Sequence, residues 1–157
     1  MRRTRLTILS LLGLLVAAAL GGGIALWSAR HAEQAPADIR QFLESYFSTW
    51  SAGDMAGYKS HFDPDAQIAM VHEGEVVYVA SLEPFVAEQA KAIRESPERM
   101  VERMTTFTAD ADAAAAQATA GWELKKGSRT VTGVDRFTLI RNPQREWKIL
   151  FLVFYER

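Results

Sequence analysis

The apolar positions between residues 39 and 50 recur in steps of three and four, which predicts one face of an amphipathic helix. That face consists of Ile39, Phe42, Leu43, Tyr46, Phe47 and Trp50. Asp38 and Gln41 have the spacing of a capping box at the start of this helix, and Gly53 suits the left-handed position after its end. We expect Asp54 to cap a second, short helix with Met55, Tyr58 and Phe62 as its buried stripe.

After Asp65 the pattern changes from helical spacing to alternation, which is typical of strands. We expect a hairpin of two strands at residues 66–72 and 76–80, and a third helix that Ser81 caps and Ser96-Pro97 ends. Four more strands are expected at about 99–108, 116–126, 129–141 and 146–156, with turns at 126–128 and 142–144. The alanine-rich segment between residues 109 and 116 is interpreted as a loose connection.

The order of elements predicts an α+β fold, in which three helices from the N-terminal half pack on a curved, cone-shaped antiparallel sheet of six strands. Such a cone encloses a natural ligand cavity. The Asp63-Pro64-Asp65 segment is interpreted as the turn between the second helix and the first strand, with its carboxylates bound to backbone N–H groups.

The last strand, WKILFLVFYE, is apolar on both faces. Alternation places Trp147, Ile149, Phe151, Val153 and Tyr155 on one face, and Leu150, Leu152 and Phe154 on the other. One face must meet the helices, so we expect the outer face of the sheet to form a homodimer. The alternative is that loops of the same chain cover it.

The N-terminus carries a targeting signal. Arg2, Arg3 and Arg5 precede an uncharged stretch at residues 6–27, which is long enough to span a bilayer as a helix. We expect residues 1–27 to be an uncleaved anchor in the inner membrane of a bacterium, with residues 28–36 as a linker and residues 37–157 as a domain outside the cytoplasm. A cleaved signal peptide, which would release a secreted domain, is the alternative.

Composition excludes several classes of function. The chain of 157 residues has no cysteine, so disulfides and thiolate chemistry are absent. Residues 37–157 carry 14 basic and 18 acidic side chains without a basic run, which disfavours nucleic-acid binding. The three histidines lack the spacing of metal ligands, and no glycine-rich phosphate loop is present. We therefore expect no metal and no cofactor.

The stretch FLESYFSTWSAGDMAGYKSHFDPDAQI resembles the nuclear transport factor 2-like superfamily, and its SnoaL-like or ketosteroid-isomerase-like branch in particular. The resemblance covers residues 37–157 and implies the cone-shaped, cystatin-like α+β fold. Members of the superfamily include isomerases, dehydratases, cyclases and pure binding modules, so the fold does not assign a function.

In the steroid isomerases of this branch, a tyrosine of the first helix donates a hydrogen bond to the developing oxyanion. The resemblance carries this role over to Tyr46, which lies eight residues before Asp54. The second oxyanion donor, a protonated acid on a late strand, corresponds to Asp135. The general base of the family corresponds to Met70, which cannot accept a proton. Steroid-isomerase chemistry is therefore not supported, and the sequence leaves open whether the protein is an enzyme.

The leading hypothesis is an anchored, extracytoplasmic domain that binds a small apolar or amphipathic ligand. One alternative is a lyase or isomerase that uses His72 with Tyr46 and Asp135, because His72 shares strand parity with the family's base. The other is a non-enzymatic assembly module of an envelope complex. The expected pocket residues are Tyr46, Trp50, Tyr58, Ile68, Met70, His72, Phe85, Glu88, Trp122 and Phe137.

Overall fold

The computed structural model describes residues 37–157, which belong to one compact unit. The predicted anchor at residues 1–27 and the linker at 28–36 lie outside the described residues. Within the described part of the chain, no helix combines the length and hydropathy needed to cross a membrane.

The first helix occupies residues 37–52 of the described chain and buries the predicted apolar face. Ile39 and Leu43 are fully buried in it. The predicted capping box at Asp38 is wrong, because residue 37 is already helical and Asp38 therefore lies inside the helix. Gly53 ends the helix with a positive φ of 73°, as predicted.

The second helix, α2 (Met55–Ser60), begins after Asp54, whose carboxylate accepts a hydrogen bond of 2.9 Å from the Gly57 N–H. This confirms the predicted cap. Phe62 was expected on the buried stripe of this helix, but the helix ends at Ser60 and Phe62 begins the first strand instead. The third helix, α3 (Leu82–Glu95), follows Ser81, whose side chain makes no capping hydrogen bond.

Six strands form one sheet in the order β2-β1-β6-β5-β4-β3. The strands are β1 (Phe62–His72), β2 (Glu75–Ser81), β3 (Met100–Ala111), β4 (Ala115–Lys126), β5 (Arg129–Arg141) and β6 (Trp147–Glu156). The prediction of a purely antiparallel sheet is wrong, because β1 and β6 pair in parallel. The long connection through β2, α3 and the β3–β5 meander permits this pairing, which a hairpin could not make.

The Asp63-Pro64-Asp65 segment lies within β1 rather than in a turn before it. The pairing of β1 with β6 breaks between Phe62 and Gln67, so this segment departs from the regular ladder. The Asp63 carboxylate accepts a 3.0 Å hydrogen bond from the Asp65 N–H, which confirms that it serves the backbone.

The alanine-rich segment is a hairpin rather than a loose connection, because β3 continues to Ala111 and β4 begins at Ala115. The Asp112 carboxylate accepts hydrogen bonds from the N–H groups of Ala114 and Ala115, at 2.7 and 2.9 Å, and so fixes the turn. These bonds hold the pKa of Asp112 below its usual value.

A β-bulge in β6 changes which side chains face the helices. Thr138 of β5 pairs with Phe151, but the next residue, Leu139, pairs with Ile149. Leu150 is therefore an extra residue in β6, and alternation is inverted after it.

The bulge corrects the predicted faces of the last strand. Trp147 and Ile149 are buried before it, and Leu152 is buried after it. Phe151 was predicted to share a face with Ile149, but it points to the other face and is 47% exposed. The sheet therefore keeps apolar contact with the helices along the whole of β6.

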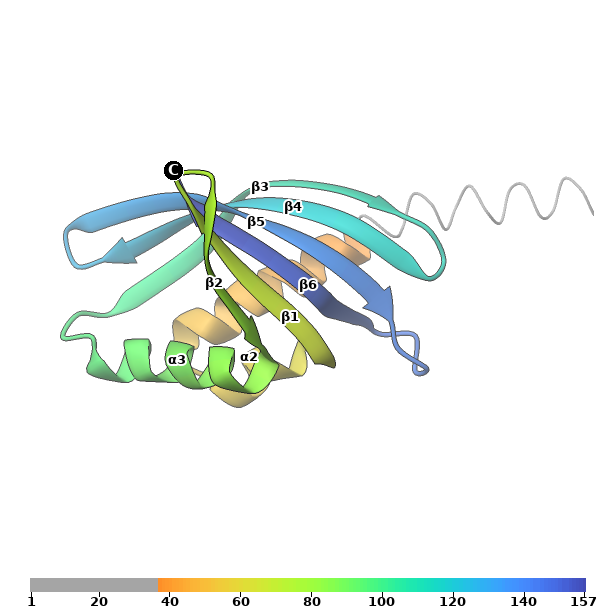
Figure 1. The fold of residues 1–157 in the computed structure, drawn as a ribbon, viewed down its shortest axis with the longest axis horizontal. Helices are drawn as coiled ribbons and strands as arrows, with labels where there is room; N and C mark the ends of the chain where they lie inside the picture. The colour runs from red at the N-terminus through yellow and green to blue at the C-terminus, as the bar shows by residue number, and fades with distance from the viewer. Residues whose placement is uncertain (1–36) are drawn as a thin grey trace, which may run out of the picture. The chain divides into compact units, whose positions relative to one another are not determined.

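The first helix, α2 and α3 all lie against the concave face of the curved sheet (Figure 1). The core sits between these two layers. Its fully buried large side chains are Phe47, Phe137, Ile39, Leu43, Ile68, Leu139, Ile149 and Leu152.

Candidate functional site

A cavity of about 190 Å³ lies between the helices and the concave face of the sheet. All three helices and the strands β3, β4, β5 and β6 contribute to its wall. The lining residues are Tyr46, Trp50, Tyr58, Phe85, Gln89, Glu102, Trp122, Leu124, Asp135, Leu152, Phe154 and Glu156. The wall is therefore mainly aromatic, with a few polar groups, as ligand sites commonly are.

Trp122 of β4 and Asp135 of β5 form a buried hydrogen bond in this wall. The indole Nε1–H donates to the Asp135 carboxylate over 2.7 Å. Gly133 makes the contact possible, because a Cβ at that position would overlap the Trp122 ring and the Tyr155 carbonyl oxygen. Trp122 and Gly133 are direct cross-strand neighbours, so the ring lies over the glycine and reaches Asp135.

Glu102 of β3 brings a second acid to the cavity. Its backbone is fixed by Ser51 of the first helix, whose hydroxyl donates to the Glu102 carbonyl and accepts from the Glu102 N–H, both at 2.8 Å. Among the described residues, no hydrogen-bond partner occurs for the Glu102 carboxylate. This group is therefore available to a ligand.

Burial in an aromatic wall disfavours the charged form of both acids. It raises the pKa of Asp135 from 3.8 to about 7, although the hydrogen bond from Trp122 acts in the opposite direction. Burial also raises the pKa of Glu102 well above its usual value, and the nearby Asp135 carboxylate raises it further. The pair therefore favours keeping a proton near neutral pH.

Two tyrosines complete the polar part of the wall. The hydroxyls of Tyr46 and Tyr58 are 2.9 Å apart and hydrogen-bonded, and their rings lie 4.9 Å apart. Burial raises the pKa of both hydroxyls well above the usual value. Both phenols therefore stay protonated. One hydroxyl donates to the other, which leaves one O–H free to donate to a ligand.

Trp50 of the first helix is oriented by α3, because its indole N–H donates to the Gln89 side-chain oxygen over 2.9 Å. The ring is thereby held in the cavity wall. Together with the Trp122 contact, this gives the cavity two indoles whose N–H groups have defined partners.

The structure gathers six of the residues singled out from the sequence around the cavity. They are Tyr46, Trp50, Tyr58, Phe85, Trp122 and Asp135. Ile68 and Phe137 are buried in the core and are not among the lining residues. Met70, the position of the family's general base, is partly buried in β1 between Tyr78 and Phe154.

His72 and Glu88 lie away from the cavity. His72 is exposed at the end of β1, where it pairs with Glu75 beside the hairpin turn. The register of the β1–β2 pair shifts between Met70 and Val71, with Val77 as the extra residue in β2, so the alternation of β1 itself is unbroken. His72 is exposed because β1 ends there, beside the hairpin turn. Glu88 is exposed on α3.

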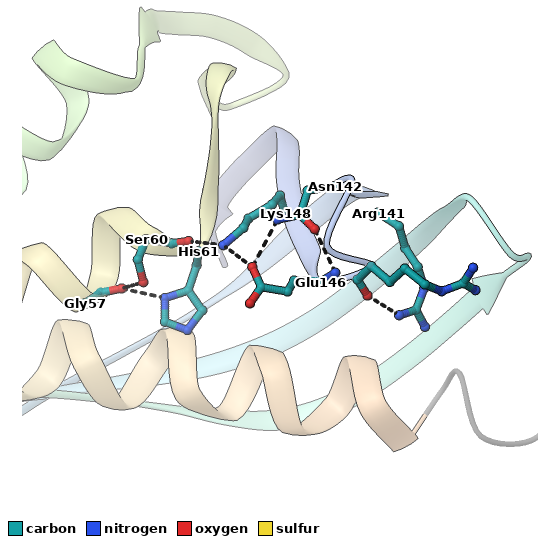
Figure 2. A network of polar contacts seen from close by, with 8 residues as sticks. Gly57, Ser60, His61, Arg141, Asn142, Glu146 and Lys148 are labelled. Carbon is teal, nitrogen blue, oxygen red and sulfur yellow. Dashed lines mark hydrogen bonds and ion pairs between the residues drawn. The ribbon is translucent and has the colours of Figure 1, made fainter.

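His61, which follows α2, is buried, with 7% of its surface exposed. Its Nδ1–H donates to the Gly57 carbonyl over 2.8 Å, and burial lowers the pKa of the ring. Figure 2 shows the surrounding network, in which Lys148 donates to the Ser60 carbonyl over 2.8 Å and pairs with Glu146 at 3.4 Å. These contacts join the end of α2 to the β5–β6 hairpin, which is a structural role.

Glu102 is one of three polar residues of the cavity, with Gln89 and Glu156, that the sequence did not predict. It alternates with Met100 and Met104 on the inward side of β3, so one acid on an otherwise apolar face was the available signal. The other missed lining residues are Gln89, Leu124, Leu152, Phe154 and Glu156. In the described part of the chain, no group of three or more acidic or histidine side chains is arranged to hold a metal ion.

The sequence profile of a family described as "putative lumazine-binding" matches residues 34–155. Solved structures of low sequence identity share the fold. A nuclear transport factor 2-like protein of unknown function from Pseudomonas putida matches with a TM-score of 0.68 and 15% identity, over 78% of this chain and 87% of that chain. One from Shewanella oneidensis, also of unknown function, matches with a TM-score of 0.59 and 20% identity, over 75% of this chain and 96% of that chain.

A nuclear transport factor 2-like protein with a cystatin-like fold from Novosphingobium aromaticivorans matches with a TM-score of 0.63 and 15% identity, over 87% of each chain. These structural similarities establish the nuclear transport factor 2-like fold, and the low sequence identities leave activity open. No curated protein is significantly similar in sequence.

Proposed function

This chain belongs to the "putative lumazine-binding" family, and from that premise we propose that residues 37–157 bind one small, apolar or amphipathic molecule in the aromatic cavity. The observation that carries the proposal is the wall itself. Aromatic rings supply apolar contact, while two acids and two tyrosine hydroxyls can fix the orientation of a polar edge.

The size of the cavity limits the ligand. Its volume of about 190 Å³ lies below the roughly 300–1,000 Å³ of pockets for drug-sized molecules. A flat ring system of one or two rings is therefore the appropriate class, and lumazine is the first probe to use because of the family description. The cavity also favours ligand binding over the role of an assembly module. An assembly module would be expected to fill the space between helices and sheet with its own side chains.

The test is a titration of the full chain with lumazine, monitored by tryptophan fluorescence. Trp50 and Trp122 line the cavity, whereas Trp147 is buried in the core outside its wall. We expect saturable quenching that Trp122→Phe reduces and Trp147→Phe leaves in place. A linear, non-saturable response, or loss of quenching in the Trp147 variant alone, would overturn the proposal for this probe and site.

A second candidate function, acid–base catalysis by a lyase or isomerase, is favoured by the two buried acids near two tyrosine hydroxyls. An acid whose pKa lies near 7 can exchange a proton at neutral pH. Tyr46 remains in this hypothesis, and the Glu102–Asp135 pair takes the place of the exposed His72 as the group that exchanges a proton. Substrate turnover that Glu102→Gln abolishes and His72→Gln preserves would support it.

We further propose that the domain is anchored by residues 6–27 in the inner membrane of a bacterium, facing away from the cytoplasm. Retention of the full chain in membranes after alkaline extraction supports this placement. A soluble, shortened product would instead support the cleaved signal peptide.

A homodimer through the outer face of the sheet is proposed on a separate observation. Phe151 and Val79 are 47% and 64% exposed. Register places both on the outer face, since their partners Gln67 and Ala69 alternate with the fully buried Ile68. Exposed apolar side chains of this size are typical of an interface.

A further inference from the structure

The charges around the cavity all have one sign. Three of the twelve lining residues are acids, Glu102, Asp135 and Glu156, and among the described residues that line the cavity none is basic. Half of the lining residues are aromatic, namely Tyr46, Trp50, Tyr58, Phe85, Trp122 and Phe154. Carboxylates and the faces of aromatic rings both attract positive charge.

Four of the six aromatic residues form a continuous cluster. The ring centroids of Tyr46 and Tyr58 lie 4.9 Å apart, those of Tyr58 and Phe85 lie 6.3 Å apart, and those of Phe85 and Phe154 lie 6.2 Å apart. A cation that enters this cluster comes within about 6 Å of several rings, which is the range of a cation–π interaction.

The two acids differ in their hydrogen bonding. Asp135 accepts the Trp122 indole N–H, whereas the carboxylate of Glu102 has no hydrogen-bond partner in the described part of the chain. An unpartnered carboxylate in an apolar wall costs free energy unless it is protonated or meets a donor. The Glu102 carboxylate is thus the open position of the site.

We propose that the cavity takes a small organic cation, a substituted ammonium with apolar groups, whose charge lies between the Glu102 and Asp135 carboxylates and whose apolar groups contact the aromatic rings. This assignment deepens the proposed ligand-binding function and rests on it. Such a ligand complements both the negative charge and the aromatic surface of the wall.

A proton and such a cation compete for the same acids. The ionisable groups that face this part of the cavity are Tyr46 and Tyr58 from the first two helices, Glu102 from β3, Asp135 from β5 and Glu156 from β6. The tyrosines stay neutral because burial raises the pKa of both hydroxyls. Cation binding therefore displaces a proton from the Glu102–Asp135 pair, and affinity rises with pH through about 7.

The test compares choline with 3,3-dimethylbutan-1-ol, in which a carbon atom replaces the charged nitrogen. The two molecules have the same shape, so a difference in affinity reports the charge alone. Calorimetric titrations of the full chain at pH 7.5 are expected to show choline binding at least about tenfold more tightly than the alcohol. Repeating both titrations at pH 5.5 is expected to weaken choline binding and leave the alcohol unchanged.

Variants locate the effect. Glu102→Gln keeps the size and polarity of the side chain and is expected to remove most of the preference for choline over the alcohol. Glu123→Gln is the matched control, because Glu123 lies on β4 beside Trp122 but pairs with Arg103 outside the cavity. It is expected to bind both probes as the wild type does.

Equal affinities for choline and the alcohol would overturn the inference and leave the proposed function standing. Choline binding that does not change between pH 5.5 and 7.5 would overturn it as well. This comparison uses the wild-type chain alone and so does not depend on whether a variant folds. Failure of both probes to bind would also overturn it, and the lumazine titration then shows separately whether the cavity binds a neutral ligand.

Discussion

At the residue scale, Gly133 controls the contact between Trp122 and Asp135. A methyl group at this position would overlap the indole ring and a backbone oxygen of β6. Gly133→Ala is therefore expected to lower the free energy of unfolding by about 1–3 kcal/mol and to displace the Trp122 ring. Chemical denaturation measures the first effect, and near-ultraviolet circular dichroism reports the second.

The matched control is Gly74→Ala. It makes the same substitution at a glycine where no atom lies within 4 Å of an added Cβ. Its positive φ of 84° gives that variant a backbone cost without any effect on the indole. An unchanged aromatic spectrum in Gly133→Ala would contradict the packing described here.

Asp135 gives stability a pH dependence with a defined sign. Its pKa is raised by burial from 3.8 to about 7, so the folded state favours the protonated acid. The stability that this group contributes is present below pH 4 and is lost as the pH rises toward 7. Asp135→Asn mimics the protonated acid and is expected to gain stability relative to the wild type over that range, by about 1.4 kcal/mol per pH unit at most.

Thermal unfolding between pH 4 and pH 8 checks this expectation. Asparagine keeps an oxygen that can accept the Trp122 N–H. The exposed Asp110 of β3 serves as the control position, as Asp110→Asn. A constant difference between Asp135→Asn and the wild type at all pH values would mean that Asp135 is ionised in the folded protein.

The residues of the site differ in how far the sequence reveals them. Tyr46, Trp50 and Trp122 were predictable, because helical spacing and strand alternation place large side chains inward. Glu102 could be predicted only from the inward face of β3, on which it is the one acidic residue. His72 has the expected parity but is the last residue of β1 and is exposed there, because alternation gives the face of a residue and not its distance from the cavity.

At the element scale, the cap of α2 makes a measurable contribution. Asp54 accepts the Gly57 N–H at the start of a helix of only six residues, which has few other local contacts. Asp54→Ala is expected to cost about 1 kcal/mol of unfolding free energy, and Asp54→Asn or Asp54→Ser less than half of that. Urea denaturation measures the difference, and equal costs for the three variants would show that the cap is unimportant.

The elements were largely predictable, whereas two features of their pairing were not. The order of helices and strands follows from the change between helical spacing and alternation. The parallel β1–β6 pair depends on contacts between residues more than 80 positions apart. The Leu150 bulge is equally hidden, because WKILFLVFYE is apolar at almost every position and so carries no alternation that could show a change of face.

At the scale of the whole molecule, the exposed outer face of the sheet bears on assembly. The side chain of Phe151 is 47% exposed, and the residue pairs with Gln67 of β1 and Thr138 of β5. If two copies pair through this face, Phe151→Glu introduces two unpaired charges into the interface and is expected to shift the mass in solution from dimer to monomer. Light scattering of the full chain over a wide range of concentrations measures this mass.

Lys91→Glu is the control, because Lys91 is exposed on α3, away from the outer face of the sheet. A wild-type mass that stays at the monomer value at all concentrations would contradict the proposed dimer.

The central claim, that the aromatic cavity binds a small molecule, is tested most directly by the indole N–H signals in a ¹H–¹⁵N correlation spectrum. The chain has four tryptophans, of which Trp50 and Trp122 line the cavity and Trp147 lies in the core outside its wall. On titration with lumazine, or with choline as the cationic probe, the account predicts saturable shifts of the Trp50 and Trp122 signals and a stationary Trp147 signal. Shifts confined to Trp147, or no saturable shift at Trp50 and Trp122 with either probe, would contradict it.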